Sequence, residues 1–427
     1  MEQVVAQPLI GSLPVQGRKM ALIAWGVAAV YFFYQYALRS APSVMMSQLS
    51  SAFGISTLAV ASISGLFYYG YAPFSLVAGA TMGELGPRKV LPIGAAVVGI
   101  GAFLFATGDG TAASIGRFLQ GVGAVFAPVG AIYIASTYFP ASQAATLIGA
   151  TQMFGMAGGS AGQFVVGPAM NAGLSWRRFW LGLGTAGFVM GAVLWLLLPK
   201  KTTATPQNWL RPAIHATYTV FKNRQSILCG LIAGLLFIPT TIFDMIWGIR
   251  YLQEAHGFDH ATAVLRSAAV PFGWIIGCPL LGYISDRLGK RKPVIIGGSL
   301  VLLACLVWIL FGRPGVFPPY VIGLIAGVAS GAAMIPYTVI KESNPPEFGG
   351  TATGVINFLN FTLSAFLAPV FAQLLQRVSQ GAEQRELAHY QIAFSPMLAC
   401  VGVAIVLTLL LRETGPATGS PFTSLKE

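Results

Sequence analysis

Twelve runs of mostly apolar residues, separated by short polar loops, fill this sequence of 427 residues almost from end to end. A helix that crosses a lipid bilayer needs about 20 such residues. Only 9% of the residues are charged, whereas a soluble domain carries about 25%. The runs lie near residues 20–45, 57–82, 88–107, 111–138, 143–170, 177–199, 226–252, 260–284, 292–312, 317–340, 348–376 and 389–411. The sequence therefore predicts an all-α polytopic membrane protein with twelve transmembrane helices.

A polar stretch with several basic residues and two prolines divides the runs into two sets of six. We interpret this stretch as a loop that joins two six-helix halves. The expected organisation is an N-terminal tail over 1–19, a six-helix bundle over 20–199, a linker loop over 200–225, a second six-helix bundle over 226–412 and a C-terminal tail over 413–427.

The net charge of +12 does not indicate a nucleic-acid partner, because the basic residues lie in short loops between apolar runs. Loops on the cytoplasmic side of a membrane protein are enriched in lysine and arginine. If both termini are cytoplasmic, the cytoplasmic segments hold 16 of the 25 basic residues. We therefore expect an even number of spans with both tails inside the cell.

The two halves resemble an internal repeat, which is a sign of duplicated architecture. Adding 203 or 205 to residue numbers of the first half reaches matching residues of the second half. The matches are Gly79 with Gly282, Gly86 with Gly289, Pro140 with Pro345, Thr146 with Thr351, Gly149 with Gly354, and Gln152 with Asn357. Two offsets that agree within two residues favour duplicated halves with small changes in loop length.

The most distinctive motif is the loop Gly282-Tyr-Ile-Ser-Asp286-Arg287-Leu-Gly289-Lys-Arg291-Lys, between the eighth and ninth runs. It places a carboxylate and several bases in a tight turn, where glycines permit close approach of the backbone. A related loop, Gly79-Ala-Thr-Met-Gly-Glu84-Leu-Gly-Pro-Arg88-Lys, lies between the second and third runs.

These two loops resemble the signature loop of the major facilitator superfamily, which occurs once in each half. Arg117-Phe-Leu-Gln-Gly-Val-Gly in the fourth run and Ser175-Trp-Arg-Arg-Phe before the sixth resemble further signatures of that family. The resemblance implies two pseudo-symmetric six-helix bundles and a gating role for the loop residues. They are Asp286, Arg287, Gly282, Gly289, Arg291, Gly79, Glu84 and Arg88. The first copy departs from the family by having Gly83 in place of the aspartate, which predicts a weaker latch in that half.

Arg39 lies deep in the first run, and Gln35 and Tyr31 share its helix face. A charge inside a membrane costs at least about 2.5 kcal/mol and persists only where it is paired or functional. A guanidinium beside an amide and a phenol is suited to binding a carboxylate or phosphate. We therefore expect these three residues to bind substrate. A structural ion pair and a position at the membrane rim are the alternatives for Arg39.

This segment resembles the organic-anion and sugar-acid branch of the superfamily, which places a substrate-binding arginine at the position of Arg39. The sequence departs from its relatives at three positions. Thr241 stands near the second arginine of the organophosphate antiporters, and Leu38 and Ala124 replace two carboxylates of the sugar-acid symporters. The resemblance implies an anionic substrate, but neither known mechanism carries over intact.

Asp244 is a carboxylate well inside the seventh run. The repeat places it within two residues of the equivalent of Arg39, so the two side chains are predicted to face each other across the central cavity. A buried carboxylate near a cation can exchange protons near neutral pH. We expect Asp244 to couple transport to protons or to pair with Arg39 in the empty site. A static salt bridge is the alternative.

Arg117 is a second buried base, in the fourth run. The family resemblance implies a role in proton transfer, and snorkelling towards the outer surface is the structural alternative. Further cavity hydrogen bonds are expected from Gln152 and Asn357, which the repeat makes equivalent, and from Asn360 and Tyr337.

No pattern in the sequence indicates an enzyme, a metal site or a cofactor. His256 and His260 are four residues apart with Asp259 between them, but a short loop holds them without a clear third ligand. The pair Gly289-Lys290 is not followed by the serine or threonine of a P-loop.

These features predict a secondary transporter that works by alternating access, with the site between the halves near mid-membrane. The predicted function is proton-coupled symport of a small organic anion or zwitterion, such as a carboxylate, sugar acid or amino acid. The expected partners are this solute, protons and membrane lipid. We expect a monomer in a bacterial-type inner (plasma) membrane.

Two alternatives remain. One is a proton-coupled efflux pump for a drug or secreted metabolite, although Gly155-Met-Ala-Gly-Gly lacks the proline that follows glycine in the fifth helix of such antiporters. The other is a membrane-embedded enzyme or a sensor that does not transport.

Overall fold

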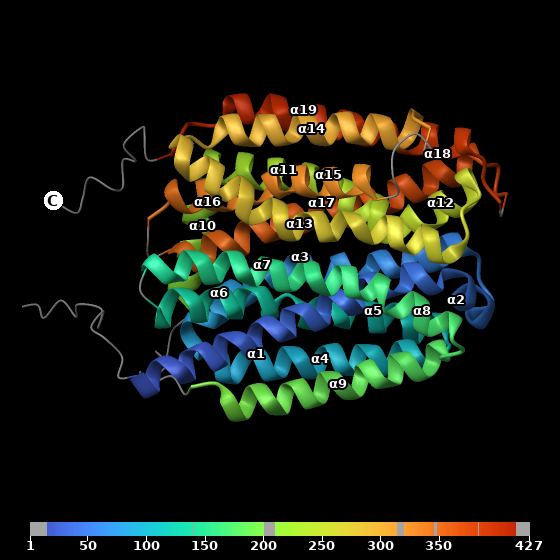
Figure 1. The fold of residues 1–427 in the computed structure, drawn as a ribbon. Helices are drawn as coiled ribbons and strands as arrows, with labels where there is room; N and C mark the ends of the chain where they lie inside the picture. Colours follow the sequence, from blue (N-terminus) through green and yellow to red (C-terminus); the bar gives the residue numbers. More distant parts are fainter. Residues whose placement is uncertain are drawn as a thin grey trace, which may run out of the picture.

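The computed structural model describes residues 15–139, 141–199, 210–313, 320–345, 348–382 and 384–415. Within these ranges the chain forms helices joined by short turns, without a β-strand. The helices lie roughly parallel or antiparallel to one axis, and the turns gather at the two ends of the molecule (Figure 1). The prediction of an all-α fold is confirmed.

The first half contains the six predicted apolar runs, three of which consist of more than one helix. Its elements are α1 (Val15–Ser40), the 3₁₀ turn η1 (Ala41–Met45), α2 (Met46–Phe53), α3 (Thr57–Leu85), α4 (Pro87–Ala106), α5 (Gly110–Ala124), α6 (Phe126–Tyr138), α7 (Ala141–Phe164), α8 (Val166–Asn171) and α9 (Trp176–Leu197).

The second half repeats this plan, with a π-helical segment in its first run. Its elements are α11 (Arg224–Ile238), the π-helix η2 (Pro239–Gly248), α12 (Ile249–His256), α13 (His260–Leu288), α14 (Lys292–Phe311), α15 (Val321–Ser330), the 3₁₀ turn η3 (Gly331–Met334), α16 (Ile335–Glu342), α17 (Gly349–Val378), α18 (Leu387–Phe394) and α19 (Pro396–Leu410).

Ten helical segments of the described chain are long and apolar enough to cross a membrane. The two remaining predicted spans are the helices α3 and α7, which have 29 and 24 residues. Both carry many serine, threonine and aromatic or amide side chains, because both pack against the other half of the molecule.

The sequence repeat between the two halves is also seen in how equivalent helices end and begin. The left-handed glycines Gly54 and Gly257 end α2 and α12, at φ of 65° and 68°. Ser56 and Asp259 then accept hydrogen bonds from the amides at the starts of α3 and α13. Such caps satisfy amides that a helix leaves unpaired, so the offset of 203 residues fixes the same turn in both halves.

The halves meet along two helix pairs, α3 with α17 and α7 with α13. In the first pair a Cβ atom at Gly79 would lie 3.2 Å from the carbonyl oxygen of Gly350, so glycine permits the close approach. In the second pair Ser160 donates a hydrogen bond of 3.3 Å to the carbonyl oxygen of Ala268. Both contacts join the first half of the chain to the second.

Peripheral helices expose apolar side chains. Leu196 on α9 is 72% exposed and Leu409 on α19 is 59% exposed. These two helices lie at the lower and upper margins of Figure 1. An apolar outer surface of this kind suits contact with lipid acyl chains.

The linker prediction was wrong in part, because residues 210–222 form the helix α10 (Leu210–Lys222) instead of a loop. Residues 200–209 lie outside the described chain. Ala216 and Val220 on α10 are buried, whereas Ile214 and Tyr218 are more than 60% exposed. This one-sided burial stabilises a helix that the proline and charges of the stretch did not suggest.

We call the end of the molecule that holds α10 and the start of α1 the linker end (left in Figure 1). The other end, with the turns at Asp109 and Asp259, is the opposite end.

Candidate functional site

Arg39 occupies the last turn of α1, in the middle third of the apolar segment Lys19–Phe53. Its side chain is buried, with 3% of the residue exposed. The chain tightens into η1 directly after this turn and continues as α2. Arg39 is therefore held inside the bundle by helix on both sides.

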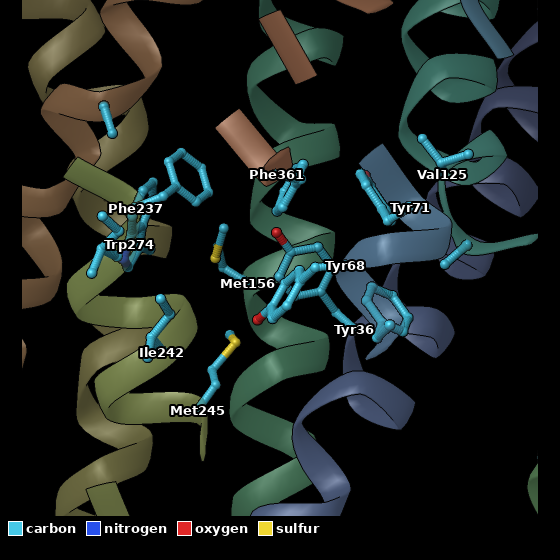
Figure 2. Close-up of a cluster of buried hydrophobic side chains, with 14 of the residues drawn as sticks. Tyr36, Tyr68, Tyr71, Val125, Met156, Phe237, Ile242, Met245, Trp274 and Phe361 are labelled. Atoms are coloured by element: carbon cyan, nitrogen blue, oxygen red, sulfur yellow. The ribbon is translucent and has the colours of Figure 1, made fainter. Parts of the chain in front are cut away.

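Four aromatic rings surround the Arg39 guanidinium. Its Cζ atom lies 4.8 Å from the ring centres of Tyr36 and Tyr68, 5.1 Å from Phe361 and 5.5 Å from Phe67. Phe361 belongs to α17 of the second half, so the cage is built from both halves. Figure 2 shows Tyr36, Tyr68 and Phe361 in this cluster. Ring faces attract a cation without neutralising it.

The hydrogen bonds of Arg39 leave part of its guanidinium free. Nη2 donates to the Tyr68 hydroxyl at 3.1 Å, and that hydroxyl donates to the carbonyl oxygen of Thr241 at 2.8 Å. Nε and Nη1 of Arg39 have no partner, although both are buried. Buried donors without partners are costly, so these two atoms are suited to donate to an acceptor group of a ligand.

Arg117 on α5 contacts the main chain at Arg39. It is 1% exposed, so the snorkelling interpretation was wrong. Nη1 donates to Oε1 of Gln120 at 2.7 Å, and Nη2 donates to the carbonyl oxygens of Ser64 at 3.3 Å and Arg39 at 3.4 Å. Arg117 thereby fixes the main chain on which the Arg39 side chain stands.

Arg39 and Arg117 line one small cavity of about 10 Å³, close to the space that one water molecule requires. Its described lining contains no carboxylate; the other lining residues are Pro42, Ser43, Met46, Ser64, Tyr68, Met245 and Ile246. Two guanidinium groups without a counter-ion make this cavity attractive to an anion.

Two predicted partners of Arg39 on α1 differ in their availability. Both amide atoms of Gln35 are buried and without a partner. The Tyr31 hydroxyl instead donates to the carbonyl oxygen of Gly123 at 2.8 Å. Gln35 thus keeps its hydrogen-bonding capacity, whereas Tyr31 ties α1 to α5 in this conformation.

The predicted polar residues of the second half form one network. Tyr337 on α16 donates to Oδ1 of Asn357 at 2.7 Å and accepts from Nδ2 of Asn360 at 3.0 Å. Oδ1 of Asn360 is buried without a partner. Tyr337 also interacts electrostatically with Arg39. The structure therefore brings these three residues to the same region as Arg39.

Gln152 on α7 crosses to the second half, where its Nε2 atom donates to the sulfur of Met334 at 3.1 Å. No hydrogen bond joins Gln152 to Asn357 in the described chain, although the repeat makes them equivalent.

The structure corrects the predicted position of Asp244, which does not face Arg39. Its Oδ1 atom accepts from the Ser267 hydroxyl at 2.8 Å, and it makes no ion pair among the described residues. Asp244 lines a separate cavity within the second half. Pairing with Arg39 and a static salt bridge are thus both wrong for this conformation.

The π-helix explains this difference. The neighbours Met245 and Ile246 line the Arg39 cavity, whereas Asp244 lines the other one. Figure 2 shows Met245 on the side of η2 that faces the aromatic cluster. The wider turns of a π-helix shift side chains around the axis relative to an α-helix, and a constant repeat offset cannot register that shift.

In the second signature loop, Arg291 is the residue that joins the elements of the linker end. Its guanidinium contacts Asp286 at 2.6 Å and Glu342 on α16 at 2.7 Å. Gly289 adopts φ of 62°, which permits the tight turn between α13 and α14. Arg287 instead lies over the ring of Tyr283 at 5.2 Å, and Gly282 has open space beside it.

The first signature loop forms no ion pair among its described side chains. Arg88 donates to the carbonyl oxygen of Leu198 at 3.4 Å and lies over the ring of Trp195. The side chain of Glu84 lies outside the described chain. At Gly79 this loop makes the close contact with the other half that is described above.

A larger cavity of about 520 Å³ lies at the linker end. Residues of α3, α6, α10, α16 and α17 line it, and its described lining includes Lys341 but no carboxylate. A basic side chain thus lines the cavity at the linker end, and two basic side chains line the cavity at Arg39. Within the described residues, no group of three or more histidine, cysteine or carboxylate side chains is placed to hold a metal ion.

Phe361 and Thr241 are site residues that the sequence analysis did not predict. Phe361 stacks on Tyr68 at 6.1 Å and lies edge-on to Tyr71 at 4.4 Å. The spacing of Tyr68 and Tyr71 on one helix face was a usable signal. The partner ring on α17 becomes apparent only in the folded molecule.

Comparison with known proteins gives one family. The Major Facilitator Superfamily profile matches residues 27–369. The chain is 22% identical to the probable sulfoacetate transporter SauU of Cupriavidus necator, over 91% of this chain and 93% of that protein. It is 26% identical to the hexuronate transporter of Bacillus subtilis, over 64% of this chain and 66% of that protein.

A solved structure has a similar fold. It is a bacterial homolog of the human lysosomal transporter Spinster, in an inward-facing and unoccupied conformation. The TM-score is 0.66 at 15% identity, over 94% of this chain and 97% of that one.

Proposed function

Because this chain belongs to the Major Facilitator Superfamily, we propose that it is a secondary transporter that takes up a small organic anion or zwitterion by proton-coupled alternating access. The solute is a carboxylate, a sugar acid or an amino acid. Relatives named for sulfoacetate and hexuronate carry anions of this kind, which supports the assignment.

The observation that carries the proposal is the pair of free donors on Arg39. A guanidinium is a strong donor to a carboxylate or sulfonate, and Nε and Nη1 of Arg39, on two different edges of the group, are left without a partner. Arg117 lies beside them and adds positive charge. Gln35, Tyr337, Asn357, Asn360 and Gln152 are the polar groups that would contact the rest of the solute.

Solute binding at Arg39 is connected to the contact between the halves. The Tyr68 hydroxyl bonds Arg39 and the Thr241 carbonyl oxygen at the same time. An anion that engages the guanidinium competes with this hydroxyl and so loosens the link to the second half. The central site would then open towards the opposite end, which we assign to the outside of the cell.

The linker end is assigned to the cytoplasm, with both termini there, because basic residues concentrate in its loops. Its gate is held by Arg291 through Asp286 and Glu342. The first signature loop adds close backbone packing at Gly79. We place the protein as a monomer in a bacterial-type inner membrane.

Proton coupling is assigned to Asp244, with Arg117 as a positioning residue. Asp244 is buried, and its Oδ2 atom is without a partner. Its neighbours in η2 line the Arg39 cavity, so a change in the charge of this carboxylate acts on the wall of the solute site.

The test is uptake by proteoliposomes that contain purified protein, with an inward proton gradient and a panel of radiolabelled carboxylates, sulfonates, sugar acids and amino acids. At least one anion should accumulate. Arg39→Gln should abolish accumulation, and Arg39→Lys should raise KM at least tenfold because lysine lacks the fork of two donors.

The matched control is Arg178→Gln, which removes an exposed arginine at the opposite end and should leave KM unchanged. Accumulation of anions by Arg39→Gln at the rate of the unaltered protein would overturn the assignment. A protein that responds only to neutral, hydrophobic compounds would point to efflux instead.

A further inference from the structure

The second half contains a cavity of its own, separate from the Arg39 site. Its volume is about 110 Å³, and residues of η2, α12, α13, α14 and α15 line it. Of these elements, α12 lies at the right of Figure 1, towards the opposite end of the molecule. An engineered protein cavity of about 150 Å³ binds benzene, so this space is of the right order for a molecule with one small ring.

One carboxylate oxygen in this cavity lacks a partner. Asp244 is 5% exposed, and its Oδ1 atom already accepts the hydrogen bond from Ser267. Its Oδ2 atom is buried without any hydrogen-bond donor. Leaving such a buried acceptor unsatisfied is energetically unfavourable, and more so when the group is charged. A ligand that brings a donor recovers this energy.

Three other polar side chains of the cavity already have partners. The Tyr251 hydroxyl donates to the carbonyl oxygen of Ile309, and Nε2 of His256 shares a hydrogen bond of 2.8 Å with that hydroxyl. Arg266 lies over the ring of Phe258 at 4.0 Å. Asp244 is thus the acceptor that a ligand would meet.

The walls of the cavity are apolar and leave room beside the carboxylate. They include Phe243, Val270, Trp308 and Ile322, and three glycines, at 248, 312 and 323, complete the lining. Tyr320 is 38% exposed, so the cavity lies close to the surface of the bundle. A carboxylate acceptor next to apolar walls matches a ligand with one hydrogen-bond-donating end and one hydrocarbon end.

We propose that this cavity is a second ligand site, which binds a small organic ammonium ion. The ammonium group donates to Oδ2 of Asp244, and the hydrocarbon body lies against Trp308 and Ile322. Oδ1 stays on Ser267. Binding here leaves the Arg39 site empty, because Met245 and Ile246 on the other side of η2 separate the two spaces.

The test measures thermal stability of the purified protein with three compounds of one size. Cyclohexylammonium has the proposed charge, cyclohexanol is its neutral counterpart, and cyclohexanecarboxylate is an anion for the Arg39 site. At a concentration about tenfold above the dissociation constant, cyclohexylammonium should raise Tm by roughly 2–5 °C. Cyclohexanol should give less than a quarter of that shift.

Two variants separate the sites. Asp244→Asn should lose the response to the ammonium ion and keep the response to the carboxylate. Arg39→Gln should do the reverse. If only the response to the carboxylate is absent, the result counts against the proposed function and not against this second site. Failure of the proposed function and failure of the second site are therefore distinguishable.

A third variant protects the test against misfolding of Asp244→Asn. Ile322→Trp keeps the carboxylate but fills part of the cavity at the start of α15, and it should reduce the ammonium response at least threefold. Equal shifts with cyclohexylammonium and cyclohexanol would overturn the proposal. So would an ammonium response that survives both Asp244→Asn and Ile322→Trp.

Discussion

The hydroxyl of Tyr68 on α3 donates a hydrogen bond of 2.8 Å to the carbonyl oxygen of Thr241 on η2. The same hydroxyl accepts a hydrogen bond from Arg39. One oxygen atom thus joins the positive centre of the first half to the main chain of the second half. An anion bound at Arg39 would disturb this link between the halves.

Removing this hydroxyl should favour opening at the opposite end. A neutral hydrogen bond contributes about 1 kcal/mol, so Tyr68→Phe should shift the equilibrium between closed and open states about fivefold. A membrane-impermeant maleimide should then label Ser43→Cys, whose side chain lines the Arg39 cavity, about fivefold faster. The labelling is measured in a variant without the four native cysteines.

Tyr69→Phe is the control for this measurement, because Tyr69 lies on the same helix and is 39% exposed. A labelling rate that does not change in Tyr68→Phe would show that the hydroxyl does not hold the closed state.

Arg117→Gln should weaken solute binding without touching the solute. The change leaves the carbonyl oxygens of Arg39 and Ser64 without the donor that now fixes them. An unsatisfied buried group costs about 1–3 kcal/mol. KM should therefore rise at least tenfold and Tm should fall, whereas kcat should change less. An unchanged KM with a lower Tm would reduce Arg117 to a purely structural role.

At the linker end, Glu342 should matter more than Asp286 to the gate. Both carboxylates bind Arg291, but the Asp286 side chain is 68% exposed and that of Glu342 is 23% exposed. Exposed ion pairs contribute little because water screens them. Hydrogen–deuterium exchange of a peptide covering 286–292 should increase more in Glu342→Gln than in Asp286→Asn. The reverse order would contradict this assignment.

The Arg291 contacts should be insensitive to pH in the physiological range. Burial lowers the pKa of Arg291, but its hydrogen bonds to Glu342 and Asp286 raise it more, so the net pKa is above its ordinary value. A group with a raised pKa contributes its stability at every pH below the unfolded value, about 12.5 for arginine, and loses it only above. Exchange protection at 286–292, corrected for the intrinsic rate, should be equal between about pH 6 and pH 9.

Asp244→Asn should uncouple transport from the proton gradient. An amide has the shape of the protonated acid but does not gain or lose charge in the physiological pH range. The variant should still exchange labelled for unlabelled solute across the membrane, whereas accumulation driven by a pH gradient should fall to the background level. Accumulation that persists in this variant would assign the coupling to another group.

The sequence predicted those parts of the fold that depend on local patterns. Apolar runs and the turn at Gly289 act over a few residues, so they can be recognised without the folded chain. The buried place of Arg39 also followed from its position inside a long apolar run.

The contents of the site were less accessible to sequence reasoning. Phe361 reaches Arg39 from a helix more than 300 residues later in the chain, which only the packing of the two halves determines. The π-helical turns at Asp244 moved its side chain to the far face of η2, away from the position that the repeat predicted. The helix α10 arose because its apolar face finds cover against the bundle.

The segment η2 separates the Arg39 cavity from the cavity that Asp244 lines. A compound bound in the Asp244 cavity would therefore not compete with the solute for Arg39. Such a compound would lower the maximal rate of transport at any solute concentration. Substitutions on α14 and α15 would prevent the compound from binding. These two helices contribute no residue to the described lining of the Arg39 cavity. Selectivity between related transporters would then depend on residues that are free to differ among proteins with the same substrate.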